Sequence, residues 1–467
     1  MQVSKKININ EFKMDSSLDL KNNYDIIKKH IKVGSKQGCF YYIDGFLKEK
    51  IMTNIMEAIL KITPEQISSI KTAEEFSSNF LNYPEIEIQT DFNMIFQNIL
   101  SGCLIFFIDD FDQSIIIDIR KYPNRSIEEP ENDKVLRGAK DGFIETPIVN
   151  IALIRRRIRS LDLKVEYFNL GEETHSDVVI CYMQSKVDGE KLENLKNKIS
   201  NLKVKSLTNG SQSLIESLST KKWINPFPKV KFTSRPDIAA SNLLEGRIIL
   251  MADNTPSVAI VPTFILDFFQ EAEDYYFPPP TGNFIRFTRI LLAIISTFVT
   301  PLWLLAIKNL SLLPTWLAFL EPKEMAGIPT LIQLLFLEFS VEALRAASVN
   351  TPAMISTSVA LIGTIIIGDI AVVSKIIMPE ALLFTAFATI GFYCQSSFEF
   401  GYALKYVRMM LLILVGLFNF YGLAIGIIIT ILMMAFNKTI TKDSFIYPLI
   451  PFNFKDLKKS LIRTKNI

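Results

Sequence analysis

The sequence predicts two architectures in one chain: an α/β cytosolic N-terminal region with two subdomains, followed by an all-α multi-spanning membrane domain. Three observations support this fold class. Uncharged stretches long enough to cross a bilayer occur only after Arg289. Before that point, strand-like and helix-like segments alternate, which is typical of α/β units. With 467 residues, the chain is also too long for one compact core.

The overall composition excludes several functional classes. The chain has 50 Lys and Arg residues against 48 Asp and Glu residues, so it lacks the positive charge typical of nucleic-acid binding. It contains no GxxxxGKS/T, GxGxxG, GxSxG or HExxH motif, and we therefore expect no enzyme activity and no cofactor. Its four cysteines are far apart and form no CxxC pair. We expect buried free thiols and no metal site.

The N-terminal region lacks the continuous apolar stretch of a secretory signal, so we expect it in the cytoplasm. We divide it into a polar segment at 1–34, a first α/β subdomain at 35–160 and a second at 161–270. Cys103–Ile119 predicts two strands around a polar turn, and Pro147–Leu163 predicts a helix. Further strands are expected at 164–169, 178–183, 247–251 and 257–261, and a polar helix at 188–201.

Four arginines cluster on the expected helix at 147–163, and they are Arg155, Arg156, Arg157 and Arg159. Two interpretations are open. The cluster binds the carboxylates of a partner or anionic lipid head groups, or it is a solvated helix face.

The membrane domain is expected at 271–437, before a basic cytoplasmic tail at 438–467. Arg286 and Arg289 precede the first span, and basic residues dominate the tail, so both ends are expected in the cytoplasm. An even number of spans follows. The candidate spans lie at 287–307, 353–377, 380–398 and 409–437.

The last candidate span is long for one helix, and Gly416, Gly422 and Gly426 would allow a tight hairpin instead. Four spans satisfy the even count if residues 331–349 do not cross. The sequence does not separate four spans from six.

Residues 331–349 carry charges on an otherwise apolar helix. At about 100° per residue, Glu338, Glu342 and Arg345 fall on one face. Either the helix lies at the membrane interface with this stripe in water, or the stripe lines a water-filled pore.

Small side chains share one face of the candidate span 353–377, and Asp369 lies on the opposite face. Such a face allows either close helix packing or a narrow pore in an oligomer. The small residues are Ser356, Ala360, Gly363, Ala371 and Ser374.

Several motifs resemble those of the A subunit of the GerA-family spore germinant receptors. The family pattern of RG, then PxxGFxE, an Asn and LIRRRI is matched by Arg137, Gly138, Gly142, Phe143, Glu145, Asn150, Arg155, Arg156 and Arg157. Further matches are Glu271–Tyr276, Glu342–Arg345, Ile367–Val372 and Pro448–Phe452 with Asp456 and Leu457. Ala139 replaces the usual Pro, and Ala346 stands where a second acid is expected.

The resemblance implies a multi-pass protein of the spore inner membrane that responds to nutrients together with a transporter-like B subunit and a lipoprotein C subunit. It also implies a homo-oligomeric channel for monovalent cations, with membrane lipid around it and the nutrient site usually assigned to the B subunit. The residues themselves leave two rivals open: a secondary transporter, and a membrane-anchored scaffold without its own pore. Glu338, Glu342, Arg345, Gly363 and Asp369 are the candidates for pore lining or gating.

Overall fold

The computed structural model divides the chain into two compact units. One unit comprises Met1–Thr220 and Phe232–Pro262, and the other comprises Lys221–Lys231 and Thr263–Ile467. Each unit is described by itself below. The residues whose structure is described are 2–121, 138–219, 225–323, 326–351 and 361–463.

The first unit contains two five-stranded sheets, and the first has the strand order β1-β2-β4-β5-β3. All of its neighbouring strands are antiparallel. The predicted hairpin at 103–119 is confirmed, because β4 pairs with β5. The strands are β1 (Ile26–Val33), β2 (Lys36–Ile43), β3 (Ile86–Gln89), β4 (Leu104–Ile108) and β5 (Ser114–Ile117).

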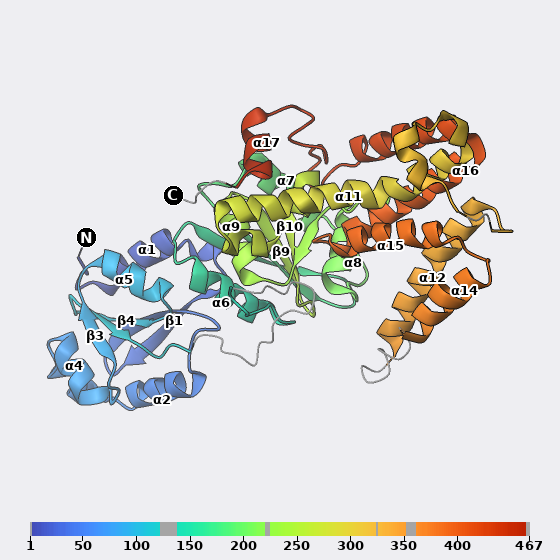
Figure 1. Ribbon diagram of the computed structural model, residues 1–467. Coiled ribbons are helices and arrows are strands. Elements are labelled where there is room, and N and C mark those ends of the chain that lie inside the picture. Colours follow the sequence, from blue (N-terminus) through green and yellow to red (C-terminus); the bar gives the residue numbers. More distant parts are fainter. Residues whose placement is uncertain (1, 122–137, 220–224, 324–325, 352–360, 464–467) are drawn as a thin grey trace. The chain divides into compact units, whose positions relative to one another are not determined.

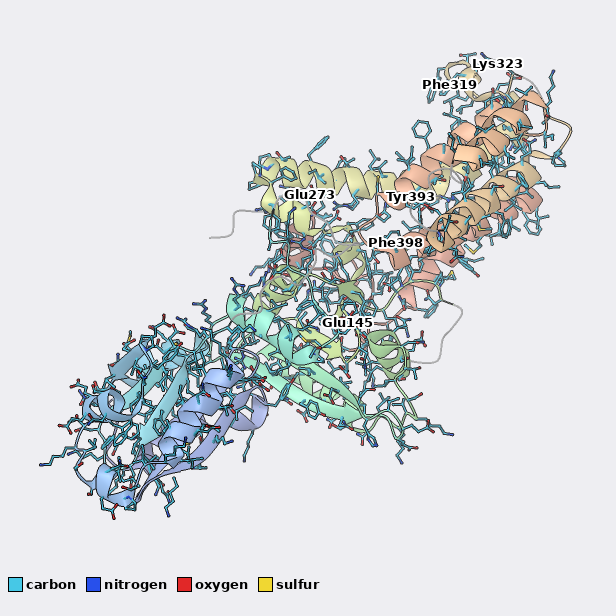
Figure 2. The ribbon with its side chains drawn as sticks, turned by 90° about the horizontal axis from the view of Figure 1, so that it is seen from below. Glu145, Glu273, Phe319, Lys323, Tyr393 and Phe398 are labelled. Carbon is cyan, nitrogen blue, oxygen red and sulfur yellow. The ribbon has the colours of Figure 1, made fainter. Side chains whose placement is uncertain are left out.

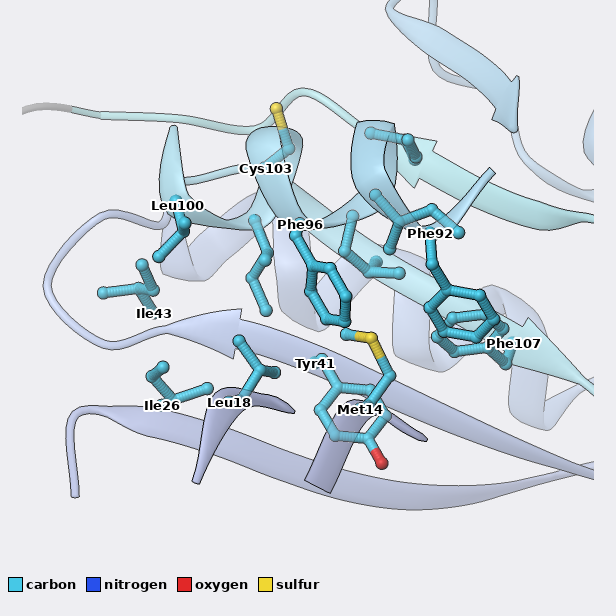
Figure 3. Packing of buried hydrophobic residues seen from close by; sticks show 14 of the residues in the cluster. Met14, Leu18, Ile26, Tyr41, Ile43, Phe92, Phe96, Leu100, Cys103 and Phe107 are labelled. Carbon is cyan, nitrogen blue, oxygen red and sulfur yellow. The ribbon is translucent and has the colours of Figure 1, made fainter. Parts of the chain in front are cut away.

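Helices cover both faces of this sheet, because its central strands are apolar on both sides (Figure 1). Phe107 packs in the core under α1 (Ile7–Leu18) and α5 (Phe92–Leu100), as Figure 3 shows. Its neighbour Phe106 points to the opposite core and stacks on Phe40 with ring centroids 4.1 Å apart. That second core lies under α2 (Glu49–Leu60), α3 (Pro64–Ser68) and α4 (Ala73–Phe80).

Residues 1–34 are part of this subdomain, whereas the sequence predicted a separate polar segment. They form α1 and β1, and α1 buries Ile7, Met14 and Leu18 against the sheet. The apolar residues are few, but their spacings of seven and four residues place them on one face of the helix.

The second sheet has the order β6-β7-β9-β10-β8. Its strands are β6 (Leu163–Leu170), β7 (Ser176–Met183), β8 (Lys231–Thr233), β9 (Ile248–Ala252) and β10 (Val258–Val261). The strands predicted at 164–169, 178–183, 247–251 and 257–261 are therefore confirmed. The associated helices are α6 (Pro147–Arg157), α7 (Gly189–Ser200), α8 (Gly210–Leu218) and α9 (Pro236–Leu244). Both subdomains have the predicted α/β architecture, and α6 and α9 share one core with the second sheet.

The second unit is helical. Among the residues described, α11 and α16 are long and apolar enough to cross a membrane. Pro301 lies within α11. The described helices are α10 (Ala272–Tyr276), α11 (Pro279–Lys308), α12 (Thr330–Asn350), a π-helix (Ile365–Ile370) continuing into α14 (Ala371–Val373), α15 (Pro379–Tyr393), α16 (Phe398–Ala435) and α17 (Phe454–Leu461).

The α16 segment is a helical hairpin, which is one of the two arrangements that its glycines left open. Asn419 breaks the helix with a φ of 53°, and the second branch packs back on the first, because Gly422 lies against Leu414 and Gly426 against Leu411. A Cβ atom on Gly422 would lie 1.9 Å from the carbonyl oxygen of Leu414, so the close approach requires glycine. The first branch also begins earlier than the expected span, and therefore includes Lys405 and Arg408.

The segment expected at 331–349 forms α12 and packs inside the helical unit. Leu334 and Leu337 share a core with Trp303, Met378 and Leu412. Tyr393 and Phe398 mark the turn between α15 and α16. Figure 2 shows this turn at the opposite end of the helices from Phe319 and Lys323, which lie in the segment between α11 and α12.

Candidate functional site

Glu338 on α12 and Arg408 on α16 form an ion pair whose side chains are both 2% exposed. Arg408 donates from Nη2 to Oε2 of Glu338 at 2.8 Å, and from Nη1 to the backbone carbonyls of Ser296 and Ala388. Its Nε atom lies 2.7 Å from Oε1 of Glu338, but the two are not aligned for a hydrogen bond. Each buried charge depends on the other, because removing one partner leaves an uncompensated charge.

Glu342, one helical turn further along α12, is the centre of a second set of contacts. It accepts hydrogen bonds from Lys405 at 2.9 Å, from the Tyr402 hydroxyl at 2.9 Å and from Nε of Arg345 at 2.6 Å. Lys405 also lies 3.7 Å from Glu338 and so connects the two carboxylates. We call the following six residues the charged cluster: Glu338, Glu342, Arg345, Tyr402, Lys405 and Arg408.

A cavity of about 400 Å³ lies beside the charged cluster. The side chain of Glu342 is 32% exposed, whereas Glu338 is buried, so the cluster changes from buried to partly exposed along α12. This arrangement brings a carboxylate and an ammonium group next to an otherwise mainly apolar space. The lining residues are Pro226, Glu338, Phe339, Glu342, Tyr402, Ala403, Lys405, Tyr406 and Met409.

The structure brings together the three charged residues that the sequence placed on one helix face, and it adds partners that the sequence analysis missed. Lys405 and Arg408 lie three residues apart, just before the uncharged stretch of the last expected span, 409–437. Their spacing of about one helical turn matches that of Glu338 and Glu342, which is the signal that would have predicted the pairing.

Gly363 and Asp369 are not members of the charged cluster. Gly363 is buried against α12, and a Cβ atom there would lie 2.0 Å from a methyl group of Leu344. The contact is the close packing that a small residue allows. Asp369 lies in the π-helix Ile365–Ile370, while Ser356 and Ala360 fall outside the described residues.

The family-motif residues in the first unit form a loop that packs on the core of the second sheet. The Asn150 side chain accepts from the backbone amide of Ile144 and donates to its carbonyl, at 2.8 and 2.6 Å. Phe143 is buried in the core, while the Glu145 side chain is exposed (Figure 2). Gly138 has a φ of 135°, a conformation that favours glycine. Gly142 is buried beside Phe143, and Arg137 lies outside the described residues.

Arg155, from the same motif, joins the two subdomains of the first unit. It is 1% exposed and donates to both carboxylate oxygens of Asp25, at 2.7 and 2.9 Å. It also donates to Asn23 and to the carbonyl of Leu163. The expectation of a solvated or partner-binding arginine is wrong for this residue, because its fork geometry suits a buried carboxylate.

The other two motif arginines differ from each other. Arg157 donates to both oxygens of Asp141, at 2.6 and 2.7 Å. Arg156 is exposed. Within the motif, Arg155 and Arg157 therefore bind carboxylates of this same chain.

Glu11, His30 and Cys39 bring potential metal-ligating atoms within 4.8 Å of one another. The ammonium group of Lys28 lies 2.8 Å from Glu11 and already supplies a cation there. Burial raises the pKa of the Cys39 thiol to about 12, which disfavours the thiolate that binds metals. We therefore assign no metal to this group. Cys394 is exposed, contrary to the expectation that the cysteines are buried.

The chain is therefore a two-part protein. A two-sheet α/β unit is followed by a helical unit, which has helices suited to a membrane and a buried charged cluster. The chain belongs to the Bacillus/Clostridium GerA spore germination protein family, whose sequence profile matches residues 16–466.

Several relatives are similar over most of the chain. Stage V sporulation protein AF of Bacillus subtilis is 33% identical, covering 97% of this chain and 92% of the relative. Spore germination protein KA of Bacillus subtilis is 27% identical, covering 96% and 83%. The crystal structure of the N-terminal domain of the A subunit of the Bacillus megaterium spore germinant receptor GerK3 is 22% identical, with a TM-score of 0.44, covering 57% of this chain and 98% of that domain.

Proposed function

We propose that this protein is the A subunit of a nutrient germinant receptor and oligomerises into a nutrient-gated channel for monovalent cations in the spore inner membrane. Its N-terminal unit and C-terminal tail face the spore core, and a transporter-like B subunit and a lipoprotein C subunit complete the receptor. The charged cluster is the observation that carries the channel proposal. Ionised groups among apolar helices are costly, and those that proteins retain usually serve ion pathways.

The arrangement of the charged cluster fits a closed state. Glu338 is held by Arg408, and Glu342 is held by Lys405, Arg345 and Tyr402. Two carboxylates of the charged cluster thus face three cations, so neither of these two acids is free to attract a permeant cation. Opening would separate Glu342 from Lys405 and turn the carboxylate toward the adjacent cavity, where it would favour cations over anions.

Planar-bilayer conductance of the purified full-length protein, combined with size analysis of its oligomers, tests this proposal. Replacing Glu342 with Gln keeps the size of the side chain and removes its charge. We expect a lower preference for cations over anions in the variant. Glu321→Gln is the matched control, because Glu321 is an exposed acid in the segment between α11 and α12 and is not a member of the charged cluster.

The outcomes separate the proposal from its rivals. A correctly assembled oligomer that conducts no ions, alone or with its B and C subunits, would overturn the channel in favour of a membrane-anchored scaffold. Saturable uptake of a nutrient by liposomes that contain this chain alone, without conductance, would favour a secondary transporter.

The 33% identity to stage V sporulation protein AF favours a second candidate, a role during sporulation itself. Deletion of the gene distinguishes the two. Loss of the response to nutrients with a normal yield of spores supports the receptor. A reduced yield of spores, with normal germination of those that form, supports the role in sporulation.

A further inference from the structure

The C-terminal segment 447–463 is fixed to the beginning of α11 through its backbone. The carbonyl of Ser460 accepts hydrogen bonds from Gln270 at 3.3 Å and from Arg286 at 2.9 Å. Asn283 on α11 donates to the carbonyl of Arg463 and accepts from its amide, at 3.1 and 2.7 Å. The Arg463 side chain returns two hydrogen bonds to the carbonyls that precede α11. Segment 447–463 therefore has a defined side that faces outward.

That outward side is apolar and aromatic. Phe452 and Phe454 are 68% and 67% exposed, and Ile450 is 61% exposed. Leu461 at the end of α17 lies on the same helix face as Phe454, seven residues away. Side chains this apolar are unfavourable in water when they gather in one patch. Such exposed apolar side chains are typical of a surface that contacts a membrane or another protein.

Lysines border this apolar side. Lys455, Lys458 and Lys459 are exposed on α17, whereas the acid of this helix, Asp456, accepts hydrogen bonds from Tyr447 and Asn453 and is partly shielded. Protein–protein interfaces are depleted in lysine, but helices that lie on membranes combine lysines on one side with large apolar residues on the other. The positive charge complements a surface of anionic lipids.

The position of the segment agrees with this partner. The hydrogen bonds between Asn283 and Arg463 place the end of α17 next to Phe284, which is 70% exposed, and one turn before Phe287, which is 67% exposed. These residues open the first helix that is suited to cross a membrane. The exposed aromatic residues at the beginning of α11 and those of segment 447–463 thus belong to two parts of the chain that are hydrogen-bonded to each other.

We propose that segment 447–463 is an interfacial anchor that binds the anionic lipid surface where α11 enters the membrane. Phe452 and Phe454 insert among the acyl chains, and the lysines of α17 bind the phosphate groups. Because α17 is hydrogen-bonded to α11, lipid binding fixes the entry point of the first span. This inference rests on the proposed insertion of α11 into the membrane.

Fluorescence quenching in lipid nanodiscs tests the anchor in the full-length protein. In a Cys394→Ser background, bimane is attached at one new cysteine, and lipids brominated on their acyl chains quench it on contact. Phe454→Cys reports on the tail, and Leu291→Cys reports on insertion of α11. Phe12→Cys, which is 76% exposed on α1, is the control that remains in water.

We expect strong quenching at positions 291 and 454 and almost none at position 12. Replacing Lys455, Lys458 and Lys459 together with Gln should reduce quenching at 454 at least about twofold in anionic nanodiscs and hardly change it in zwitterionic ones. Quenching at 291 should stay the same, which shows that the variant is folded and inserted.

Three results overturn the inference. Quenching at 291 without quenching at 454 removes the anchor while the membrane proposal stands. Absence of quenching at both positions removes the insertion of α11 and the proposed channel with it. Emission at 454 that is shifted to the blue in detergent oligomers, and is unaffected by bromination, shows that a second copy of the chain covers this surface.

Discussion

Two arginines are buried in ion pairs, Arg155 in the α/β unit and Arg408 in the helical unit, and their hydrogen bonds to the paired carboxylate differ. Arg155 binds both oxygens of Asp25 and has further acceptors in Asn23 and Leu163, so its donors are well satisfied. Arg408 also donates to two backbone carbonyls, of Ser296 and Ala388, but it makes only one aligned hydrogen bond to Glu338, and its second contact to this carboxylate is poorly aligned. The first pair is typical of a fixed joint between subdomains.

The second pair continues into a network that ends at a cavity. Lys405 lies within 4 Å of both Glu338 and Glu342, and so provides each carboxylate with an alternative cation. A fully satisfied buried pair holds one geometry, whereas charges with several nearby partners can exchange them at lower cost. We therefore expect Arg155 to stabilise the folded first unit and Arg408 to belong to a site that can change its ion pairs. The following predictions test that assignment.

Arg155→Ala should have the largest effect. The substitution leaves Asp25 buried without its partner, and we expect a loss of about 3–5 kcal/mol in the free energy of unfolding of the first unit. Hydrogen exchange of β1 and β6 in the full-length protein measures it. Arg156→Ala is the control, because Arg156 is exposed, and it should change stability by less than about 0.5 kcal/mol. Equal effects of the two substitutions would contradict the joint.

Arg408→Met should cost less, about 3 kcal/mol, because Lys405 can approach Glu338 and replace part of the lost charge. The double variant Glu338→Gln/Arg408→Met should recover most of this loss, since neither charge is then left alone. Thermal unfolding in detergent gives the energies. If the double variant is as unstable as the sum of the single ones, the two residues are not coupled and the proposed pair is wrong.

Gly363→Ala tests whether close packing against α12 matters. Its new methyl group would overlap with Leu344, and we expect a loss of about 1–2 kcal/mol and weaker assembly. Gly368→Ala is the matched control in the same segment, because nothing lies within 4 Å of a Cβ atom there. Thermal unfolding and size analysis of both variants should separate them. Identical behaviour would show that position 363 tolerates a larger side chain.

The Asp118–Arg120 pair should give the smallest effect. The hydrogen bond from Arg120 lowers the pKa of Asp118, so the folded state binds this proton less readily than the unfolded state. The pair therefore stabilises the protein above the ordinary pKa of Asp, and this contribution disappears as the pH falls through the lowered value. The effect should stay below about 1 kcal/mol, because both side chains are 30% exposed. Asp118→Asn should reduce the dependence of the free energy of unfolding on pH between about pH 5 and about pH 3. An unchanged dependence would show that the Asp118–Arg120 pair does not contribute to stability.

Local patterns along the chain determined much of this protein. Apolar runs with turn residues located the β4–β5 hairpin and the strands of the second sheet, because strand formation depends on neighbouring residues. The glycines of the last expected span allowed a hairpin without requiring it, and the structure places its turn at Asn419. Hydrophobicity divided the chain into an α/β part and an apolar part, and family motifs identified the family.

The tertiary structure alone decided which charges meet. Arg155 and Asp25 are 130 residues apart in sequence, and Glu338 and Arg408 are 70 apart, so no local period relates them. Helical geometry placed Glu338, Glu342 and Arg345 on one face, but whether that face met water, lipid or other side chains depended on the packing of α16. Burial and ion pairing are properties of three-dimensional neighbours, and for that reason they became visible only when the helices were assembled.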